Sequence, residues 1–579
     1  MSDSLEQYKK IRDPIYGYIK IEESIAHNII DTAAFQRLRN IRQTSYAPLY
    51  PSSLHNRFVH SLGVYYLGCM AFKAICRSLE YHEETGTYIL KDIKALLSTS
   101  IKRYKKLFQL ACLLHDVGHS PFSHTGEEFY ISSLSHVKLK EGHKYNIYSH
   151  LTYLTKDKDF EAAKTYDVAP HEVMSCIVAL EKFGKDNTYF KNNAEKSFFA
   201  RCITGIPYGE ALPLTQAQVM SMSDASLKDA RKEMFLNCII RLLHSTVIDV
   251  DRLDYIIRDA ATMGYQSVSI DYKRLLSGLE LVMEDDYNFT VGFHKNAISI
   301  IENAIFAHDN EKKWVQSHPA IIYETFLLKK SIIHVESRIR HEYPESSSTL
   351  FSFDSLTDTG SKFLSKSENE QKVDTLHIHY LCDADLIFLI KNPYTSHYSE
   401  EYFNRNKRRL PVWKSEAEFR SLFTKSERKA INEAMEKIMS NNTGLVDDIE
   451  ITEETLEDIK VAIEEARIGF TERARILEEK QGYITKIFDL CEQFGISKSF
   501  VLISKAFFKS NFSKDDMGKI PIYFPVSQKF CALKDVSTTL SSNQTDNEKL
   551  IYFYYYPKQN REKIDTDSFS KKLLDILKY

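Results

Sequence analysis

Three short segments, far apart in the chain, place histidines and aspartates in apolar, helix-like surroundings. They are the stretch around His60, the run LLHDVGHSPFSH at 113–124 and the run IDVDRLDYIIRD at 248–259. So many titratable side chains are costly to bury unless a metal ion or a network of partners compensates them. Any fold of this chain must therefore bring the segments together, and a metal site accounts for all three at once.

Four of these side chains make a complete ligand set for a divalent cation. Two imidazoles and two carboxylates suit Mg, Mn, Fe or Zn, because mixed nitrogen and oxygen ligands are compatible with each of these metals. The four are His60, His115, Asp116 and Asp251. Spare imidazoles stand nearby at His119, His124 and His171. A metal site ringed by histidines indicates a hydrolase that cleaves phosphate esters.

The spacing in the second segment predicts a helix with one polar face. His115 and His119 are four residues apart and would share that face, with Asp116 about a quarter of a turn round. Pro121 would end the helix, which lets His124 return towards the same pocket. A lone histidine in an apolar helix is more often a satisfied core residue, so only the conjunction of the segments favours the metal site.

The third segment predicts a helix with a polar stripe. Asp251, Tyr255 and Asp259 are spaced four residues apart, so a carboxylate, a phenol and a second carboxylate lie along one side. Two alternatives stay open here. The aspartates could pair with Arg252 and Arg258 on a solvated face, and Tyr255 alone could be a core residue.

The rest of the chain predicts a mainly α protein. Helical periodicity fills the first 340 residues behind a small β-hairpin at 11–21, and an α+β region follows. We expect a helical core at 1–340, a Ser-rich linker or mobile loop at 341–375, and an α+β C-terminal region at 376–579. A helical insertion at about 425–495 would serve oligomer contacts or regulation.

Individual elements follow from periodicity and turn residues. Helices are expected at 60–79, within 94–118, from Pro170, across 234–260, as a pair from Ser299, and at 381–390, 425–443 and 452–494; strands are expected at 520–526 and 549–557. Residues 125–170 are polar and weakly periodic, which indicates an excursion from the core. Residues 211–230 are expected to form a loop or lid.

Composition limits the partners and the compartment. A net charge of -3 over 579 residues gives no global basic field of the kind that drives nucleic-acid binding, so nucleic acid is not an expected partner. The nine cysteines form no C-x-x-C pair, as in reduced cytosolic proteins. The N-terminus has no apolar signal region, and no stretch approaches the ~18 apolar residues of a transmembrane helix. We expect a cytoplasmic protein without membrane contact.

At these residues the sequence resembles the HD-domain metal-dependent phosphohydrolases, and most closely their deoxynucleoside triphosphate triphosphohydrolases (dNTPases). The resemblance is carried by DPIYGYIKI (13–21), IIDTAAFQRLRNIRQ (29–43), HNRFVHSLGVYYL (55–67), HDVGHSPFSH (115–124), PHEV (170–173) and DVDRLDYIIRDA (249–260). It implies an HD-domain helical core. It also implies removal of the whole tripolyphosphate from a dNTP, as in dGTPase-like enzymes. About ten residues precede the core, so the SAM domain that some members carry is not expected.

The resemblance also implies a role for each matched position. His60, His115, Asp116 and Asp251 are similar to the four metal ligands, and Asp251 would also face the substrate. His119, His124 and His171 are similar to catalytic histidines, with His124 the acid that protonates the leaving 5′ oxygen. Glu172 and Glu127 would orient neighbouring imidazoles. Arg57 is similar to a phosphate contact, Gln43 and Asp259 to contacts with the sugar 3′-hydroxyl, and Tyr255 to the residue beneath the sugar.

Two segments depart from the family pattern. Members of the family carry an arginine for the γ-phosphate and a Tyr-x-His against the ribose 2′ position, whereas this chain has HDNEKKWVQSHP at 308–319. There His318 matches the final histidine, Gln316 replaces the tyrosine, and Lys312 or Lys313 would supply the cation. Residues 405–419 are similar to a basic segment that helps bind an allosteric nucleotide at subunit contacts. A nucleotide-regulated homodimer or homotetramer is therefore expected; the alternative is a solvated basic loop.

Two other functions stay open beside a dNTPase that controls dNTP pools or starves infecting phage. Another HD-type phosphohydrolase, such as a nucleotidase or cyclic-nucleotide phosphodiesterase, would share the four ligands without needing Gln43, Tyr255 and Asp259 for a deoxysugar. A nucleotide-sensing protein without activity would be expected to have a broken ligand set, yet all four ligands are present.

Overall fold

The computed structural model describes two compact units. Its described residues are 7–45, 47–85, 88–134, 146–166, 168–185, 187–209, 213–245, 248–265, 269–343, 350–364, 375–391, 396–441, 444–467, 471–508, 510, 517–524, 529–537, 549–557 and 562–578. The first unit comprises Met1–Glu311, Ile332–Ile390 and Ser510–Ser542; the second comprises Lys312–Ser331, Lys391–Lys509 and Asn543–Tyr579. The units alternate along the chain, and the division into 1–340, 341–375 and 376–579 stays a prediction.

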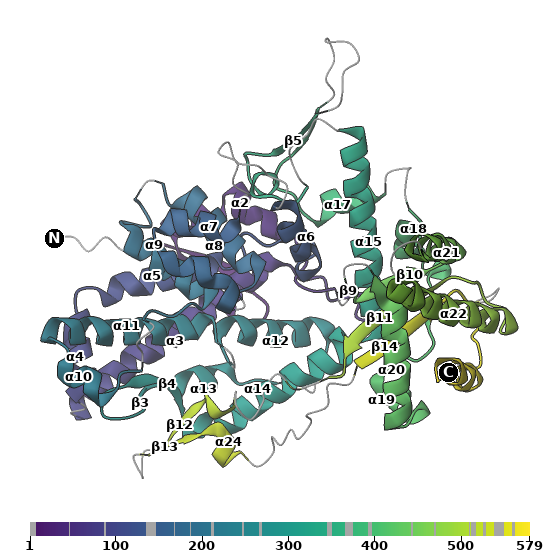
Figure 1. The fold of residues 1–579 in the computed structure, drawn as a ribbon. Coiled ribbons are helices and arrows are strands. Elements are labelled where there is room, and N and C mark those ends of the chain that lie inside the picture. The colour runs from purple at the N-terminus through teal and green to yellow at the C-terminus, as the bar shows by residue number, and fades with distance from the viewer. Residues whose placement is uncertain are drawn as a thin grey trace. The chain divides into compact units, whose positions relative to one another are not determined.

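The first unit is largely helical, as Figure 1 shows in purple to teal. It opens with the predicted hairpin, in which β1 (Tyr8–Asp13) pairs antiparallel with β2 (Gly17–Glu22). Asp13 closes the turn, because its Oδ1 accepts the backbone N–H groups of Ile15 and Tyr16 at 2.8 and 3.0 Å. Gly17 follows with φ of 79°, a left-handed conformation that glycine adopts without strain. The hairpin is confirmed.

The core of the first unit is built around α3 (Arg57–Thr85), which contacts α5 (Ile101–Leu114) and α12 (Val250–Met263). α3 is long and apolar enough to cross a membrane, contrary to the expectation from the sequence. Its window Arg57–Tyr81 is, however, 72% buried within the protein, as in the core helix of a folded domain. The helices expected at 60–79 and within 94–118 are confirmed.

The segment 125–170 is not an excursion, which corrects the expectation from the sequence. It contains α6 (His124–Leu134), α7 (Ile147–Thr155) and the 3-10 helix η3 (Lys158–Tyr166). Ile147, Leu151 and Phe160 are almost fully buried. Periodicity was weak because these helices are short and bury few residues each; residues 135–145 lie outside the described ones.

Two further expectations about helices are wrong. Residues 211–230 contain α10 (Gln216–Ser221) and the start of α11 (Asp224–Leu243), capped by the side chains of Thr215 and Ser223. The segment 234–260 forms two helices, because α11 ends at Leu243 and Asp249 caps α12 by accepting the Arg252 N–H. Asp and Ser favour such caps over helix interiors, which the apolar pattern alone does not reveal.

The other described elements of the first unit complete this core. They are α1 (Glu23–Ile25), η1 (Ala26–Ile30), α2 (Ala33–Gln36), η2 (Arg37–Asn40), α4 (Tyr88–Leu97), α8 (Pro170–Phe183), α9 (Asn193–Thr204), α13 (Tyr272–Ser277), β3 (Leu279–Met283), β4 (Phe289–His294), η4 (Lys295–Ala297), α14 (Ile298–Glu311), α16 (Phe353–Leu356), β5 (Ser361–Leu364), β6 (Thr375–Ile378), α17 (Asp383–Ile390), β12 (Pro521–Phe524), β13 (Lys529–Ala532) and α24 (Leu533–Val536). One sheet has the order β13-β12-β4-β3. The described part of the predicted Ser-rich linker thus contains α16 and β5; residues 344–349 and 365–374 lie outside the described ones.

The second unit is α+β. Its sheet has the order β10-β11-β14-β7, formed by Asp448–Ile451, Phe500–Ala506, Lys549–Tyr555 and Leu410–Pro411. The helices are α18 (His397–Phe403), η6 (Arg405–Lys407), α19 (Glu416–Leu422), α20 (Lys425–Met439), α21 (Glu453–Arg467), α22 (Thr471–Gln493) and α25 (Thr566–Leu577), with the short strands β8 (Ser440–Asn441) and β9 (Gly444–Leu445). Trp413, Phe500 and Phe553 lie in its core.

Helix α15 (Pro319–Glu342), preceded by η5 (Lys312–Gln316), begins in the sequence of the second unit and ends in that of the first. The predicted fold class, a mainly α core with an α+β C-terminal region, is confirmed.

A close approach of backbone segments at Gly118 fixes the turn that follows α5. The Gly118 N–H donates to Ser175 Oγ at 3.0 Å, and its carbonyl accepts from the Tyr130 hydroxyl at 2.8 Å. A Cβ at this position would lie 2.4 Å from the backbone carbonyl carbon of Met174 and the backbone nitrogen of Ser175. Backbone atoms of a packed helix cannot yield, so only glycine fits here.

We therefore expect Gly118→Ala to lower the free energy of unfolding of the first unit by at least about 2 kcal/mol, through overpacking. The control is Gly482→Ala in α22, where a Cβ meets nothing within 4 Å. That change should stabilise by about 0.5–1 kcal/mol, because alanine is the better helix former. Denaturant titrations followed by circular dichroism measure both, and an unshifted midpoint for Gly118→Ala would contradict the packing described.

Candidate metal centre and histidine cluster

The predicted metal ligands come together in the first unit. His60 lies one turn into α3, His115 and Asp116 follow the end of α5, and Asp251 lies in the first turn of α12. The Nε2 atoms of His60 and His115 are 3.3 Å apart. Asp251 Oδ1 lies 2.8 and 3.5 Å from these two nitrogens, and Asp116 Oδ2 lies 3.8 and 3.6 Å from them.

The donor set fits a divalent cation. The ring nitrogen on the far side of each imidazole is already engaged: His60 Nδ1 lies 2.8 Å from Asp254 Oδ2, and His115 Nδ1 lies 2.9 Å from the Cys112 carbonyl oxygen. Both Nε2 atoms are thereby turned towards the same carboxylates. The ligand atoms of His60, His115 and Asp116 all lie within 4.8 Å of one another, close enough to hold one metal ion.

The charges around this centre are tightly coupled. Burial opposes ionisation of Asp116, but the Arg57 guanidinium at 2.7 Å and the two imidazoles lower its pKa to about 2. Hydrogen bonds from His115 and His60 hold the pKa of Asp251 well below its usual range despite desolvation. Conversely, Asp251 and Asp254 raise the pKa of His60 to about 10 against the effect of burial. The carboxylates are therefore ionised and ready to bind a cation.

His119 does not share a helical face with His115, which corrects the expectation from spacing. α5 ends at Leu114, and residues 115–118 form a turn in which the His119 N–H donates to the Asp116 carbonyl at 2.9 Å. The turn sends His119 into a second group of side chains. Its members are His119, His124, Glu127 and His171, and their ligand atoms also lie within 4.8 Å of one another.

Glu127 organises this histidine cluster. Its Oε1 lies 2.5 Å from His124 Nδ1, 3.1 Å from His171 Nδ1 and 3.6 Å from His119 Nε2. The ring of His119 stacks on that of His171 at 4.3 Å between centroids. His124 is 73% exposed, whereas His119 is fully buried. The exposed imidazole thus lies at the open side of the cluster.

Protonation is divided unequally within the cluster. Burial opposes protonation of His171, but the Glu127 carboxylate raises the pKa of His171 to about 9. Conversely, His171 and His124 hold the pKa of Glu127 far below its usual value. Burial and the neighbouring cations Arg57 and His171 keep the pKa of His119 well below 6.5. At neutral pH the cluster therefore holds an ionised Glu127–His171 pair beside a neutral His119.

The residues predicted to contact the sugar are linked through His55, which sequence reasoning missed. The Gln43 N–H donates to the His55 carbonyl at 3.0 Å, and His55 Nε2 lies 2.6 Å from Asp259 Oδ1. Burial raises the pKa of Asp259 to about 7. Tyr255 lies on the same helix as Asp259, with its ring 6.3 Å from that of His308.

Arg57 connects the metal centre to the loop that carries the histidine cluster. Its Nη1 donates to Asp116 and its Nε donates to Ser123 Oγ at 2.8 Å. Its Nη2 is buried without a hydrogen-bond partner, as are Gln43 Oε1 and both ring nitrogens of His119. These buried polar atoms belong to residues predicted to act on the substrate.

Glu172 forms its ion pair with His244 and not with the histidine cluster of the described residues, although its charge helps to raise the pKa of His171. Its Oε1 lies 3.0 Å from His244 Nε2, while its Oε2 accepts the Ala169 N–H at 2.9 Å and caps α8. Burial disfavours the charged form of His244, but the Glu172 carboxylate raises the pKa of His244 to about 9. Sequence reasoning missed His244, although it ends the apolar run MFLNCIIRLL seven residues before Asp251.

Two more missed residues hold the loop between the clusters. Arg37, fully enclosed, donates to the carbonyl oxygens of His119 and Leu381 at 2.6 and 2.7 Å. Asp383 accepts the N–H groups of Phe122 at 2.7 Å and Arg42 at 3.0 Å. Phe122 and Ser123 have φ of 57° and 55°, a left-handed conformation that costs energy in residues with a side chain. Asp383 thus holds the strained turn that delivers His124.

Lys312 and His318 belong to the second unit, so their predicted contacts with the substrate stay predictions. His318 Nδ1 accepts the Ala320 N–H at 3.1 Å at the start of α15.

In the basic segment 405–419, Arg408 pairs with Glu324 at 2.6 Å, and buried Arg409 pairs with Glu401 and Glu450. Arg405 and Lys407 are exposed.

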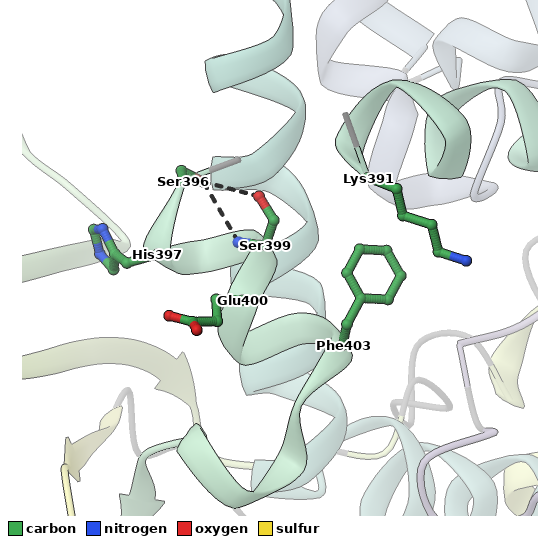
Figure 2. Close-up of a pocket in the computed structure, with 6 residues that line it drawn as sticks. All are labelled: Lys391, Ser396, His397, Ser399, Glu400 and Phe403. Atoms are coloured by element: carbon green, nitrogen blue, oxygen red, sulfur yellow. Dashed lines mark hydrogen bonds between the residues drawn. The ribbon is translucent and has the colours of Figure 1, made fainter. Parts of the chain in front are cut away.

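A separate pocket of about 720 Å³ lies in the second unit and is lined by Lys391, Ser396, His397, Ser399, Glu400 and Phe403. Figure 2 shows Lys391 and Phe403 on one side of it, and Lys391 lies 5.2 Å from the Phe403 ring centre. Two charged or polar side chains of the pocket form ion pairs with other residues of the second unit: Glu400 pairs with Lys407, and His397 pairs with Glu450. None of the predicted site residues lines this pocket.

Comparison with known proteins supports the assignment of the motifs. No protein-family model matches the chain. Over 270 residues the chain is 30% identical to the bovine deoxynucleoside triphosphate triphosphohydrolase SAMHD1, covering 46% of this chain and 38% of that protein. Over 125 residues it is 37% identical to a putative HD domain-containing protein of Acanthamoeba polyphaga mimivirus, covering 21% and 26%. The resemblance to HD-domain dNTPases is confirmed.

The HD-domain resemblance has a limited extent. The chain spans about half the length, or less, of the curated relatives it matches. A crystal structure of a hypothetical protein from Aquifex aeolicus aligns with 98% of this chain and 99% of its own at a TM-score of 0.50 and 16% identity, which shows a similar fold and no more.

The Glu127–His171 pair gives a prediction about pH. Because the pKa of His171 rises from 6.5 to about 9, the stability from its charge is complete below about pH 6.5 and is lost as the pH rises through 9. Glu127 has a lowered pKa, so its contribution is present above its ordinary value of 4.5. We expect Glu127→Gln to lower the free energy of unfolding most at pH 5–6.5. The difference from the wild type should shrink by up to about 3 kcal/mol by pH 9.

Denaturant unfolding at pH 6, 7.5 and 9 measures this deficit. Glu181→Gln, which removes the carboxylate facing His150 at 3.3 Å on neighbouring α7, is the matched control. A deficit for Glu127→Gln that stays constant across the three pH values would contradict the ionised pair.

Proposed function

We propose that this protein is a metal-dependent dNTP triphosphohydrolase that converts a dNTP to a deoxynucleoside and inorganic triphosphate. The observation that carries the proposal is the pairing of a carboxylate-rich centre with a histidine cluster, joined by Arg57. The first suits a cation and phosphate oxygens, and the second suits proton transfer. The likeness to a dNTPase over 46% of the chain supports the choice of substrate.

His60, His115, Asp116 and Asp251 would hold the divalent cation, whether Mg, Mn, Fe or Zn. A bound cation supplies positive charge that offsets the phosphate charge and favours attack at phosphorus. Arg57 adds its own charge at the same place, since Nη2 remains available to a phosphate oxygen. Lys312 is proposed as a further phosphate contact.

The leaving group sets the task of the histidine cluster. Water attacks the α-phosphorus, the bond from phosphorus to the 5′ oxygen breaks, and that oxygen must receive a proton. His124 is the exposed imidazole of the cluster, so we assign it the role of acid. Glu127 orients it at 2.5 Å, and His119 and His171 position the scissile phosphate. Glu172 acts through His244 at the edge of the site.

Gln43, Tyr255 and Asp259 are proposed to bind the deoxysugar. Gln43 Oε1 is buried without a partner, and the raised pKa of Asp259 keeps a proton available, so both can hydrogen bond a hydroxyl. His318 would exclude ribonucleotides. We further propose assembly as a homodimer or homotetramer that a nucleotide regulates, with the exposed Arg405 and Lys407 of the basic segment as its contacts.

A product assay tests the proposal. We expect purified protein with Mn²⁺ or Mg²⁺ to release inorganic triphosphate from dNTPs, alone or in mixtures that provide an activating nucleotide. Asp116→Ala should abolish turnover while leaving the fold mostly intact. NTPs, dNMPs and a cyclic dinucleotide are tested in parallel. Orthophosphate or monoester products would favour a different HD-type phosphohydrolase, no turnover would favour a nucleotide sensor, and full activity of Asp116→Ala would refute the assigned centre.

The acid role of His124 has a sharper test. We expect His124→Ala to lose about 10²- to 10⁴-fold in kcat on a dNTP, the usual contribution of a positioned general acid. On p-nitrophenyl triphosphate the loss should be at most several-fold, because p-nitrophenolate leaves without a proton. His150→Ala, another histidine that faces a glutamate, is the matched control and should be active on both substrates. Equal losses of His124→Ala on both substrates would exclude the acid role.

A further inference from the structure

A buried chain of charged side chains extends from the metal centre to the N-terminal hairpin. Asp254 follows Asp251 by three residues on α12 and is fully buried, and its Oδ2 lies 2.8 Å from His60 Nδ1. This is the ring nitrogen that points away from the other ligands. None of the motifs singled out in the sequence assigns a role to Asp254.

Arg258 holds the Asp254 carboxylate at both oxygens. Its Nε donates to Oδ2 at 2.9 Å and its Nη2 donates to Oδ1 at 3.0 Å, while its Nη1 donates to Asp13 Oδ2 at 2.9 Å. Asp13 is fixed in turn by the hairpin, whose backbone N–H groups donate to its other oxygen. A bidentate guanidinium–carboxylate pair fixes the plane as well as the position of the carboxylate.

The packing around this pair leaves room for nothing else. A Cβ at Gly63, one turn after His60 on α3, would lie 1.9 Å from Asp254 Oδ1 and 2.6 Å from Arg258 Nη2. Glycine at this position therefore allows α12 to bring its carboxylate against α3. The same approach sets the distance between Asp254 and the His60 ring.

We propose that Asp254, held by Arg258 and Asp13, is a positioning residue that fixes His60 with Nδ1 protonated and Nε2 free for the cation. The inference rests on the proposed metal dependence of the site, and it is independent of the substrate. A carboxylate can only accept a hydrogen bond, so it demands a proton on Nδ1 and leaves the lone pair on Nε2. Loss of such a partner commonly weakens metal binding by about 10- to 100-fold.

The test is the affinity of the metal-stripped, full-length protein for Mn²⁺, measured from the free-ion signal in electron paramagnetic resonance. We expect Asp254→Asn to weaken binding at least about 10-fold, because the amide can turn its NH₂ towards Nδ1 and so move the proton to Nε2. Asp157→Asn is the matched control. It breaks a partly buried pair of the first unit, with Arg201 Nη2 at 2.7 Å from Asp157 Oδ2, and should bind Mn²⁺ as the wild type does.

Folding is monitored separately by thermal unfolding. Should Asp254→Asn fail to fold, Arg258→Lys decides, since lysine keeps the charge but loses the bidentate grip; we expect it to bind Mn²⁺ several-fold more weakly than the wild type. The proposal is overturned if Asp254→Asn folds and binds Mn²⁺ with wild-type affinity. Where Asp254→Asn does not fold, wild-type affinity of Arg258→Lys overturns it. An equal loss of Mn²⁺ affinity in Asp157→Asn also overturns it. Wild-type protein that binds Mn²⁺ but hydrolyses no dNTP would sink the proposed function and leave this inference standing.

Discussion

The charge balance at the candidate metal centre is the constraint on which the rest of the first unit depends. Four buried or half-buried carboxylates, from Asp13, Asp116, Asp251 and Asp254, face two guanidiniums, from Arg57 and Arg258. Two negative charges therefore remain among these six side chains. Without a cation the imidazoles take up protons, which is why the pKa values of His60 and His115 are raised despite burial. A divalent cation would supply the same charge, so the site is matched to one in charge as well as in donor atoms.

The loop between the clusters shows how distant chain segments control a site. Arg37 and Asp383, which are more than 300 residues apart in the chain, bind the backbone of residues 119 and 122. Their hydrogen bonds stabilise the left-handed residues Phe122 and Ser123, which reverse the chain after the predicted metal ligands. That reversal places His124 in the second cluster, apart from His115. A carboxylate-rich centre and an imidazole-rich cluster can then lie close together with different protonation.

The sequence was sufficient for the fold class, for the long helices of the core and for the convergence of the predicted ligands that a motif contains. His60, His115, Asp116 and Asp251 converge as expected, because each stands at a fixed place in a helix or its end. The prediction that His119 shares a helical face with His115 was wrong. α5 ends at Leu114 because of tertiary contacts of Gly118, which the periodicity of the sequence does not reveal. His55, His244, Asp254 and Asp383 were missed for a related reason. Each acts through a partner far away in the chain, and many aspartates and histidines could have made such a pair.

Buried polar atoms without partners connect this architecture to a ligand. Arg57 Nη2, Gln43 Oε1 and both ring nitrogens of His119 are buried and form no hydrogen bond to another described residue, although His119 Nε2 lies 3.6 Å from Glu127 Oε1. A buried polar atom that stays without a partner costs about 1–3 kcal/mol. A fold selected for stability alone would pair them or replace them with apolar groups. In the proposed function, a phosphate oxygen of the substrate would accept from Arg57 and a sugar hydroxyl would donate to Gln43. Under the same proposal, binding of the substrate would pair these atoms, so that they would contribute affinity for it.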